Sequence, residues 1–168
     1  MRVGGYPAPF RRLLGIVVPE FWPHAAGETR QVTMDGTDYS CEVWSDWIEL
    51  EGADAVAVFR DGWLSGRPAV TRNGSAWYVG TQLDAAGMEA LVGKLADATG
   101  VAPPLEAPRS VEVVQREGEG WPFLFLLNHG AEEATVELAG RYRDLLGDVD
   151  CAGVVTLEPF GIAVLKAS

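Results

Sequence analysis

Residues able to do acid–base chemistry are present in this 168-residue sequence, but they are scattered. Four glutamates could supply the two carboxyl groups that general acid–base catalysis uses: Glu20, Glu49, Glu51 and Glu158. Each lies within ordinary strand or loop patterning, and charged residues in such positions usually have structural or surface roles. The carboxylates alone therefore indicate no active site.

The histidines and cysteines do not complete a catalytic or metal-binding set. His24 lies in a proline-rich loop and His129 in a tight turn, and neither has a neighbour that indicates a triad or a metal site. Cys41 and Cys151 are far apart, which favours a pair of buried thiols over a disulfide, and no metal-ligand spacing is present. We therefore predict no catalytic residue, no cofactor and no metal site.

Six tryptophans are the remaining candidates for ligand contact. A flat aromatic ring complements the apolar face of a pyranose sugar, so an exposed tryptophan could form a sugar-stacking surface. Core packing is the more common role, and Trp77 is expected in the core because it lies in a hairpin strand. Trp121 is the candidate for a weak carbohydrate contact.

Composition excludes several classes of partner. The formal net charge is −11 and the sequence pI is about 4.5, and Arg11-Arg12 is the only adjacent basic pair. Because phosphate binding needs clustered Lys and Arg, we predict neither nucleic-acid nor membrane binding. No secretory signal and no apolar run of about 18 residues occurs, so we predict a soluble, cytoplasmic protein.

The stretch at residues 59–84 organises the elements that follow. Asn73-Gly74 between two β-prone runs predicts a hairpin with a type I′ turn, in which both central residues need a positive φ. A helix is then predicted from the 3.6-residue spacing of apolar side chains at Met88, Leu91, Val92, Leu95 and Ala96. Thr81 with Asp84 fits a capping box at its start, and Gly100 fits its end.

Shorter elements are predicted before this stretch. Residues 9–14 favour one helical turn ending at Gly15, and residues 16–21 favour an edge or bulged strand because of Pro19. Asp35-Gly36 predicts a second hairpin, between strands at 31–34 and 39–47. Residues 53–59 are almost continuously apolar, which is typical of a strand covered on both faces.

A proline-rich segment divides the chain. Residues 102–108, APPLEAP, should interrupt both helix and sheet, so we predict an α/β domain at 1–101, a linker at 102–108 and a β domain at 109–168. The β domain is expected to be a small antiparallel sandwich. Its predicted strands are six in number: residues 110–116, 122–128, 134–138, 142–146, 154–157 and 162–165.

Short motifs occur along nearly the whole chain. Two of them lie in the central stretch, GRPAVTRN at 66–73 and AWYVGTQLD at 76–84. The others are GGYP at 4–7, LGI at 14–16, PEF at 19–21, GA at 52–53, VEVVQR at 111–116, FLLNH at 125–129, DLL at 144–146 and PFGIAVL at 159–165. Each motif is weak alone, but together and in this order they specifically resemble the C-terminal half of the family 42 glycoside hydrolases, which are β-galactosidases.

The resemblance implies an arrangement of domains. In that family a catalytic (β/α)₈ barrel precedes a Rossmann-like or amidotransferase-like α/β trimerisation domain, and a small β-sandwich follows. The GGYP match lies well inside the trimerisation domain, so the resemblance predicts a domain truncated at its start and no barrel. The family's acid/base glutamate follows an asparagine, whereas Asn73 and Asn128 are followed by Gly74 and His129. No catalytic residue carries over.

Three functions follow from these observations. The first is the non-catalytic C-terminal portion of a β-galactosidase-like enzyme, which self-associates, with a homotrimer favoured, or supports a separate catalytic barrel chain. The alternative is a stand-alone carbohydrate-binding module that uses Trp121. A third, a small-molecule-binding α/β domain, is weak because Cys41 lacks the glycine-flanked strand-to-helix context of a nucleophile.

Overall fold

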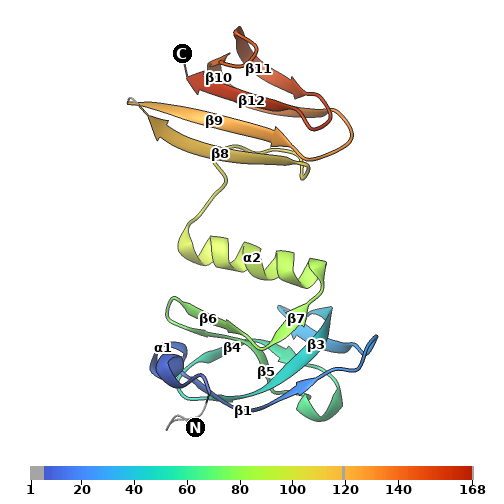
Figure 1. Ribbon diagram of the computed structural model, residues 1–168. Helices are drawn as coiled ribbons and strands as arrows, with labels where there is room; N and C mark the ends of the chain where they lie inside the picture. The colour runs from blue at the N-terminus through green and yellow to red at the C-terminus, as the bar shows by residue number, and fades with distance from the viewer. Residues whose placement is uncertain (1–5, 119, 168) are drawn as a thin grey trace. The chain divides into compact units, whose positions relative to one another are not determined.

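The computed structural model describes residues 6–118 and 120–167, and of Trp121 it describes the backbone alone. The chain forms two compact units, Met1–Gly100 and Val101–Ser168, called here the first and second units (Figure 1). Among the described residues no helix combines the length and apolar character that crossing a membrane requires.

The first unit is built mainly from antiparallel strands. Its sheet has the order β1-β3-β2-β4-β5-β6, and β7 pairs with β3. The elements are η1 (Ala8–Phe10), α1 (Arg11–Leu14), β1 (Ile16–Pro23), β2 (Arg30–Met34), β3 (Thr37–Leu50), β4 (Asp54–Phe59), η2 (Gly62–Leu64), β5 (Pro68–Asn73), β6 (Ala76–Val79), β7 (Thr81–Leu83) and α2 (Ala85–Thr99).

The strand pairings of the first unit form a closed circuit. Gly80, between β6 and β7, donates its N–H to Ala69 and accepts from the N–H of Asp46, both at 2.8 Å. Strand β6 pairs with β5, and β7, which follows it directly, pairs with β3. The pairings therefore run from β3 through β2, β4, β5 and β6 and return through β7 to β3. Closure satisfies backbone groups that an open sheet would leave at its edges.

A Rossmann-like arrangement of this unit is not supported. That arrangement needs parallel strands joined by crossovers of a dozen or more residues. Every strand pair described here is antiparallel, because the connections are hairpins and short loops, and α2 is the one long helix among the described residues. The unit is α/β only in containing both a sheet and a helix.

Two hairpin turns were predicted, and one differs in register. Asp35 and Gly36 have φ of 51° and 79° between β2 and β3, which confirms that hairpin. In the other, Asn73 is the last residue of β5, so the central pair is Gly74-Ser75 instead of Asn73-Gly74. Gly74 has φ +60°, which fits a type II′ turn, where the first central residue alone needs a positive φ.

The predicted features of the first strand and its preceding turn are confirmed. Helix α1 ends at Gly15, which is left-handed with φ +62°. Strand β1 lies at one end of the sheet path, and its register with β3 shifts between Val17 and Glu20, where Pro19 stands. Proline removes a ladder donor, so an irregular edge position accommodates it.

Helix α2 begins and packs differently from the prediction. Asp84 itself is the N-cap, and its carboxylate accepts from the Gly87 N–H at 2.7 Å, so the capping box on Thr81 was wrong. The end at Gly100 is confirmed. Leu91 is buried and packs in the core, whereas Met88 and Val92 are 39% and 54% exposed.

Strand β4 is covered on one face. Ala57 and Phe59 are buried, whereas Val56 and Val58, which alternate with them, are half-buried and the first two residues of the strand are exposed, so the prediction of burial on both faces was wrong. The reason is the alternation of a strand in an antiparallel sheet, which has one packed face and one open face. The core of the first unit gathers Val32, Met34, Cys41, Ala57, Phe59, Leu64, Ala69, Val70, Leu83 and Leu91.

The second unit is a five-stranded antiparallel sheet with the order β11-β10-β12-β9-β8. The two strands predicted at 134–138 and 142–146 form one strand. Residues 139–140 lie at a shift in its register with β11, where a break between strands was predicted. All five strands join in one sheet, so two separate sandwich sheets are not seen in the described part. The strands are β8 (Val111–Gly118), β9 (Trp121–Asn128), β10 (Ala134–Asp144), β11 (Val149–Leu157) and β12 (Ile162–Ala167).

Candidate functional site

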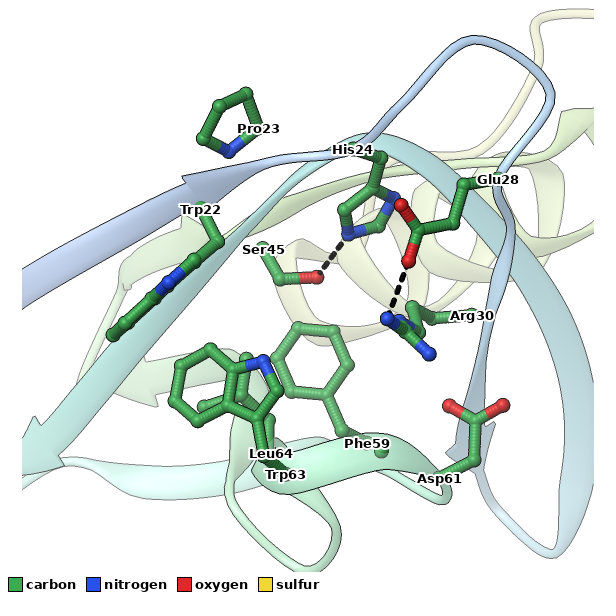
Figure 2. Close-up of a pocket in the computed structure, with 11 residues that line it drawn as sticks. Trp22, Pro23, His24, Glu28, Arg30, Ser45, Phe59, Asp61, Trp63 and Leu64 are labelled. Atoms are coloured by element: carbon green, nitrogen blue, oxygen red, sulfur yellow. Dashed lines mark hydrogen bonds and ion pairs between the residues drawn. The ribbon is translucent and has the colours of Figure 1, made fainter.

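A small polar and aromatic cavity opens in the first unit, and we call it the Trp22–Trp63 pocket (Figure 2). Its volume is about 180 Å³. It is formed where the end of β1, the start of β2, the middle of β3 and the β4–η2 segment meet. The lining residues are Trp22, Pro23, His24, Glu28, Arg30, Ser45, Phe59, Asp61, Gly62, Trp63 and Leu64.

Strand pairing and a bulge bring Ser45 to this pocket. The β1–β3 register places Ser45 opposite Trp22. The β3–β7 register shifts between Glu42 and Ser45, and within this bulge Val43 has φ +69°. Bulges redirect side chains, and a β-branched residue at positive φ is strained, which is more common at functional sites. Ser45 is 3% exposed.

His24 and Ser45 form a hydrogen-bonded pair, as Figure 2 shows. The distance from His24 Nε2 to Ser45 Oγ is 2.8 Å. The backbone N–H of His24 donates to the backbone carbonyl of Val43, also at 2.8 Å. A catalytic Ser–His pair also needs a group that orients the other ring nitrogen. His24 Nδ1 is buried and has no hydrogen-bond partner among the described residues, so no triad is formed.

The acidic and basic side chains at the pocket are held by their neighbours. Glu28 forms an ion pair with Arg30 and accepts from the Ala25 N–H at 3.0 Å. That backbone hydrogen bond, with the charges of Arg30 and His24, lowers the pKa of Glu28 despite its partial desolvation. Asp61 accepts from the Gln31 N–H at 3.1 Å. These groups are fixed donors and acceptors around the cavity.

Two tryptophans, Trp22 and Trp63, form the aromatic wall of the pocket, and a third, Trp47, packs against both. The ring centroids of Trp22 and Trp63 are 3.8 Å apart, with planes at 60°. The Trp47 ring centroid lies 6.4 Å from that of Trp22 and 6.1 Å from that of Trp63. The guanidinium of Arg67 lies 4.2 Å from the Trp47 ring centroid, a cation–π contact that fixes this third ring.

A second, larger hollow lies on the same unit, and we call it the β1–β3 groove. Its volume is about 870 Å³, and it is lined by Tyr6, Val17, Val18, Pro19, Glu20, Phe21, Trp44, Asp46, Glu49, Tyr78 and Val79. The hydroxyl of Tyr78 donates to Asp46 Oδ2 at 2.6 Å. Burial raises the pKa of Asp46 against the opposing effect of that hydrogen bond, and burial also raises the pKa of Tyr78.

The four glutamates singled out from the sequence are dispersed. Glu20 and Glu49 line the β1–β3 groove, Glu51 forms an ion pair with Arg11, and Glu158 lies in the second unit. His129 lies on the surface of the second unit, with Nε2 2.9 Å from Glu112 Oε2.

Both asparagines hold local structure. The Asn73 amide donates to the Leu13 carbonyl at 2.9 Å. The buried Asn128 amide donates to the carbonyls of Glu132 and Glu158 at 2.8 and 3.0 Å. Asn73 therefore fastens β5 to helix α1, and Asn128 holds two loops of the second unit.

The cysteines are both free thiols. Cys41 is buried in the first core, where desolvation raises its pKa, and Cys151 on β11 is half-buried. The expectation of two buried thiols therefore holds for Cys41 and only in part for Cys151. No group of His, Cys, Asp and Glu suited to a metal ion occurs among the described residues.

Sequence reasoning missed most of the pocket. Ser45, Trp22 and Trp63 come together through strand pairing between distant segments, which a single sequence does not reveal. The signal that was available is the cluster of Trp22, Pro23 and His24 at the end of a predicted edge strand. The Trp121 side chain, the predicted sugar contact, lies outside the described residues.

Comparisons with known proteins define the family. Residues 1–102 match the model of the β-galactosidase trimerisation domain, and residues 110–167 match the model of the β-galactosidase C-terminal domain. The chain therefore belongs to the family 42 glycoside hydrolases, as the sequence motifs predicted.

Particular relatives are β-galactosidases over the same region. β-Galactosidase LacZ of Heyndrickxia coagulans is 39% identical across 98% of this chain and 25% of its own length. A β-galactosidase of an Arthrobacter species is also 39% identical, across 98% of this chain and 24% of its length. The crystal structure of β-galactosidase from Bacillus circulans sp. alkalophilus superposes with a TM-score of 0.90 and 32% identity, over 99% of this chain and 26% of that one. The chain thus spans about a quarter of the length of its relatives.

Proposed function

We propose that this chain is the non-catalytic C-terminal portion of a β-galactosidase-like glycoside hydrolase, and that it serves oligomerisation and the structural support of a catalytic barrel. The observation that carries the proposal is the match of both accessory domains, in order, across nearly the whole chain. We retain the division into a domain at 1–101, a linker at 102–108 and a domain at 109–168 as part of the proposal.

The proposal assigns self-association to the β1–β3 groove, with a second copy of the chain as the occupant. The groove is largely apolar, and Phe21 at its rim is 65% exposed. It lies along β1, which is the end strand of the sheet. Among the strands of the described residues, β1 pairs with β3 alone. Exposed apolar area beside a sheet edge is a common association surface.

Light scattering after size-exclusion chromatography, across a dilution series, tests this assignment. We expect an oligomer, with a trimer as the specific state, and we expect Phe21→Asp to shift it towards monomer by placing a charge in the groove. The matched control is Phe160→Asp, an equally exposed aromatic of the second unit, which should leave the oligomer intact. A wild-type chain that stays monomeric at micromolar concentrations contradicts the assignment.

An activity assay tests the non-catalytic part of the proposal. The purified chain should hydrolyse a chromogenic β-galactoside no faster than buffer, because no acid/base residue of the family carries over to this sequence. Turnover that persists through repurification, and that is lost when Glu20 or Glu49 is replaced by Gln, would overturn it.

A further inference from the structure

We propose that the Trp22–Trp63 pocket binds one neutral sugar ring. This pocket is separate from the β1–β3 groove, to which oligomerisation is assigned. It has indole rings on one side, on which a sugar ring could stack, and fixed polar groups on the other (Figure 2).

The aromatic wall suits the apolar face of a pyranose. Trp63 is 49% exposed although it stands beside a cavity and touches two other indoles, so part of its ring surface is open to a ligand. Trp22 meets it at 60°, so the two rings form a corner instead of a flat stack. Both rings also contact Trp47, which is itself held under the Arg67 guanidinium, so the movement of the corner is limited before a ligand arrives. Preorganised aromatic surface binds at low entropic cost.

The polar side of the pocket suits hydroxyl groups. Ser45 and His24 form one hydrogen-bonded pair, and Glu28 with Arg30 forms another. Together with Asp61 they present both donors and acceptors, which a molecule with several hydroxyls satisfies.

Charge and size narrow the class of ligand. Glu28 and Asp61 carry two negative charges against the single positive charge of Arg30, which disfavours an anion. The absence of a His, Cys, Asp and Glu cluster among the described residues disfavours a metal ion. Pockets for drug-sized ligands occupy about 300–1,000 Å³, so a cavity of about 180 Å³ fits a smaller molecule such as one sugar ring.

Titration with methyl pyranosides tests the inference. Methyl β-galactopyranoside and methyl β-glucopyranoside should quench or shift tryptophan fluorescence at millimolar concentrations, and should move the backbone NMR signals of Ser45 and Trp63. Galacturonate, which has a similar ring and a negative charge, should bind more weakly. Protein that gives no NMR change with either pyranoside, or that binds galacturonate more tightly, overturns the inference.

Variants locate the binding surface. Trp63→Ala should weaken pyranoside binding by about tenfold, because it removes one stacking surface. Trp63→Phe keeps an aromatic ring and should give an intermediate loss, which preserves the test should the alanine variant fail to fold. The control is Phe21→Ala, an exposed aromatic of the same unit in the other hollow. Equal losses in Trp63→Ala and Phe21→Ala would contradict binding at this pocket.

Discussion

The two units use buried polar groups for different purposes. In the first unit, Ser45, Asp46, Thr71 and Thr81 are buried, and the first two border the Trp22–Trp63 pocket and the β1–β3 groove. In the second unit, Asn128 is the buried polar side chain among the described residues. The hydrogen bonds of its side-chain amide all go to backbone groups in loops of its own unit.

In the first unit, buried polar side chains are available at hollows that could take a ligand or partner. In the second unit, the buried polar side chain stabilises loops. Burying a polar group without compensation costs free energy, so polar groups persist in a core where they complete structure or face a ligand. The first unit places two of its four buried polar side chains, Ser45 and Asp46, beside hollows, whereas the second satisfies the one buried amide described there within its own loops. Binding properties of this chain are therefore expected in the first unit.

The distribution of tryptophan allows each unit to be followed separately. Five of the six tryptophans, Trp22, Trp44, Trp47, Trp63 and Trp77, belong to the first unit. Tryptophan fluorescence therefore reports mainly on unfolding of the first unit, while far-UV circular dichroism reports on both. A loss of stability can therefore be assigned to one unit by comparing the two signals.

The largest effect is expected at Gly15 in the first unit. Its carbonyl accepts from the N–H groups of Glu51 and Ala53 at 2.7 and 3.2 Å, and an added Cβ would stand 2.9 Å from the Ala53 nitrogen. Gly15→Ala combines this clash with a positive φ and should cost on the order of 3 kcal/mol of unfolding free energy. The midpoint of fluorescence-detected unfolding should fall accordingly.

Gly74→Ala is the matched control. Gly74 has nearly the same φ, +60° against +62°, but a Cβ there meets nothing within 4 Å. It should therefore cost about 1–2 kcal/mol, the strain of a positive φ at the first central position of the turn, without a clash. Equal losses at the two positions would show that the close approach at Gly15 relaxes, and that the first unit is less tightly packed than its geometry indicates.

The fold was predictable wherever a local signal decided the structure. Asp35-Gly36, Gly15, Gly100 and the irregularity at Pro19 each depend on the backbone preference of one or two residues. Thr81 was misassigned because its role is tertiary, since its hydroxyl donates to the Trp44 carbonyl at 2.6 Å and its strand pairs with β3. The closed circuit of strands depends on the same long-range pairing.

The candidate site was less predictable for a related reason. Trp22 and Ser45 are brought opposite one another by the β1–β3 register, and Trp63 reaches them from a separate 3₁₀ turn. The polar residue types were visible in the sequence, but their convergence depends on pairing between segments far apart in the chain. The motif resemblance identified the family because it requires no knowledge of these contacts.

An intermediate effect is expected at Asn128 in the second unit. Asn128→Ala removes donors from two loop carbonyls and the acceptor of the Gly130 N–H, in a residue that is 3% exposed. Leaving such groups unsatisfied should cost about 2 kcal/mol. The loss should be seen by circular dichroism and leave the fluorescence transition nearly unchanged.

The control is the other asparagine. Asn73→Ala removes exposed hydrogen bonds to the Arg12 and Leu13 carbonyls, so it should cost less than about 1 kcal/mol and affect the fluorescence transition. Two results would contradict the role of Asn128 as the internal polar support of the second unit. One is an Asn128→Ala loss that is seen in the fluorescence transition, and the other is an Asn128→Ala variant as stable as wild type.

The smallest effect concerns Asp46 and depends on pH. Burial raises the pKa of Asp46 in the folded chain, so the folded state retains its proton at pH values where the unfolded state has lost it. This contribution to stability is complete below the unfolded pKa of about 3.9 and is lost as pH rises through the folded pKa. Asp46→Asn should therefore reduce the decline in first-unit stability between acidic and neutral pH. The change should be less than about 1 kcal/mol, because the hydrogen bond from Tyr78 offsets part of the effect of burial.

A second variant makes the sign of this prediction testable. The Tyr78 hydroxyl donates to Asp46 at 2.6 Å and lowers the pKa of that carboxyl, so Tyr78→Phe should raise it further and steepen the same decline. Fluorescence-detected melting temperatures of the two variants and of wild type, measured from acidic to neutral pH, compare the three slopes. Opposite changes from Asp46→Asn and Tyr78→Phe identify Asp46 as the titrating group, because loss of packing alone lowers stability equally at every pH. Parallel slopes in all three proteins would instead show that Asp46 ionises in the folded chain as it does in the unfolded one, and that the β1–β3 groove is wetter than its burial indicates.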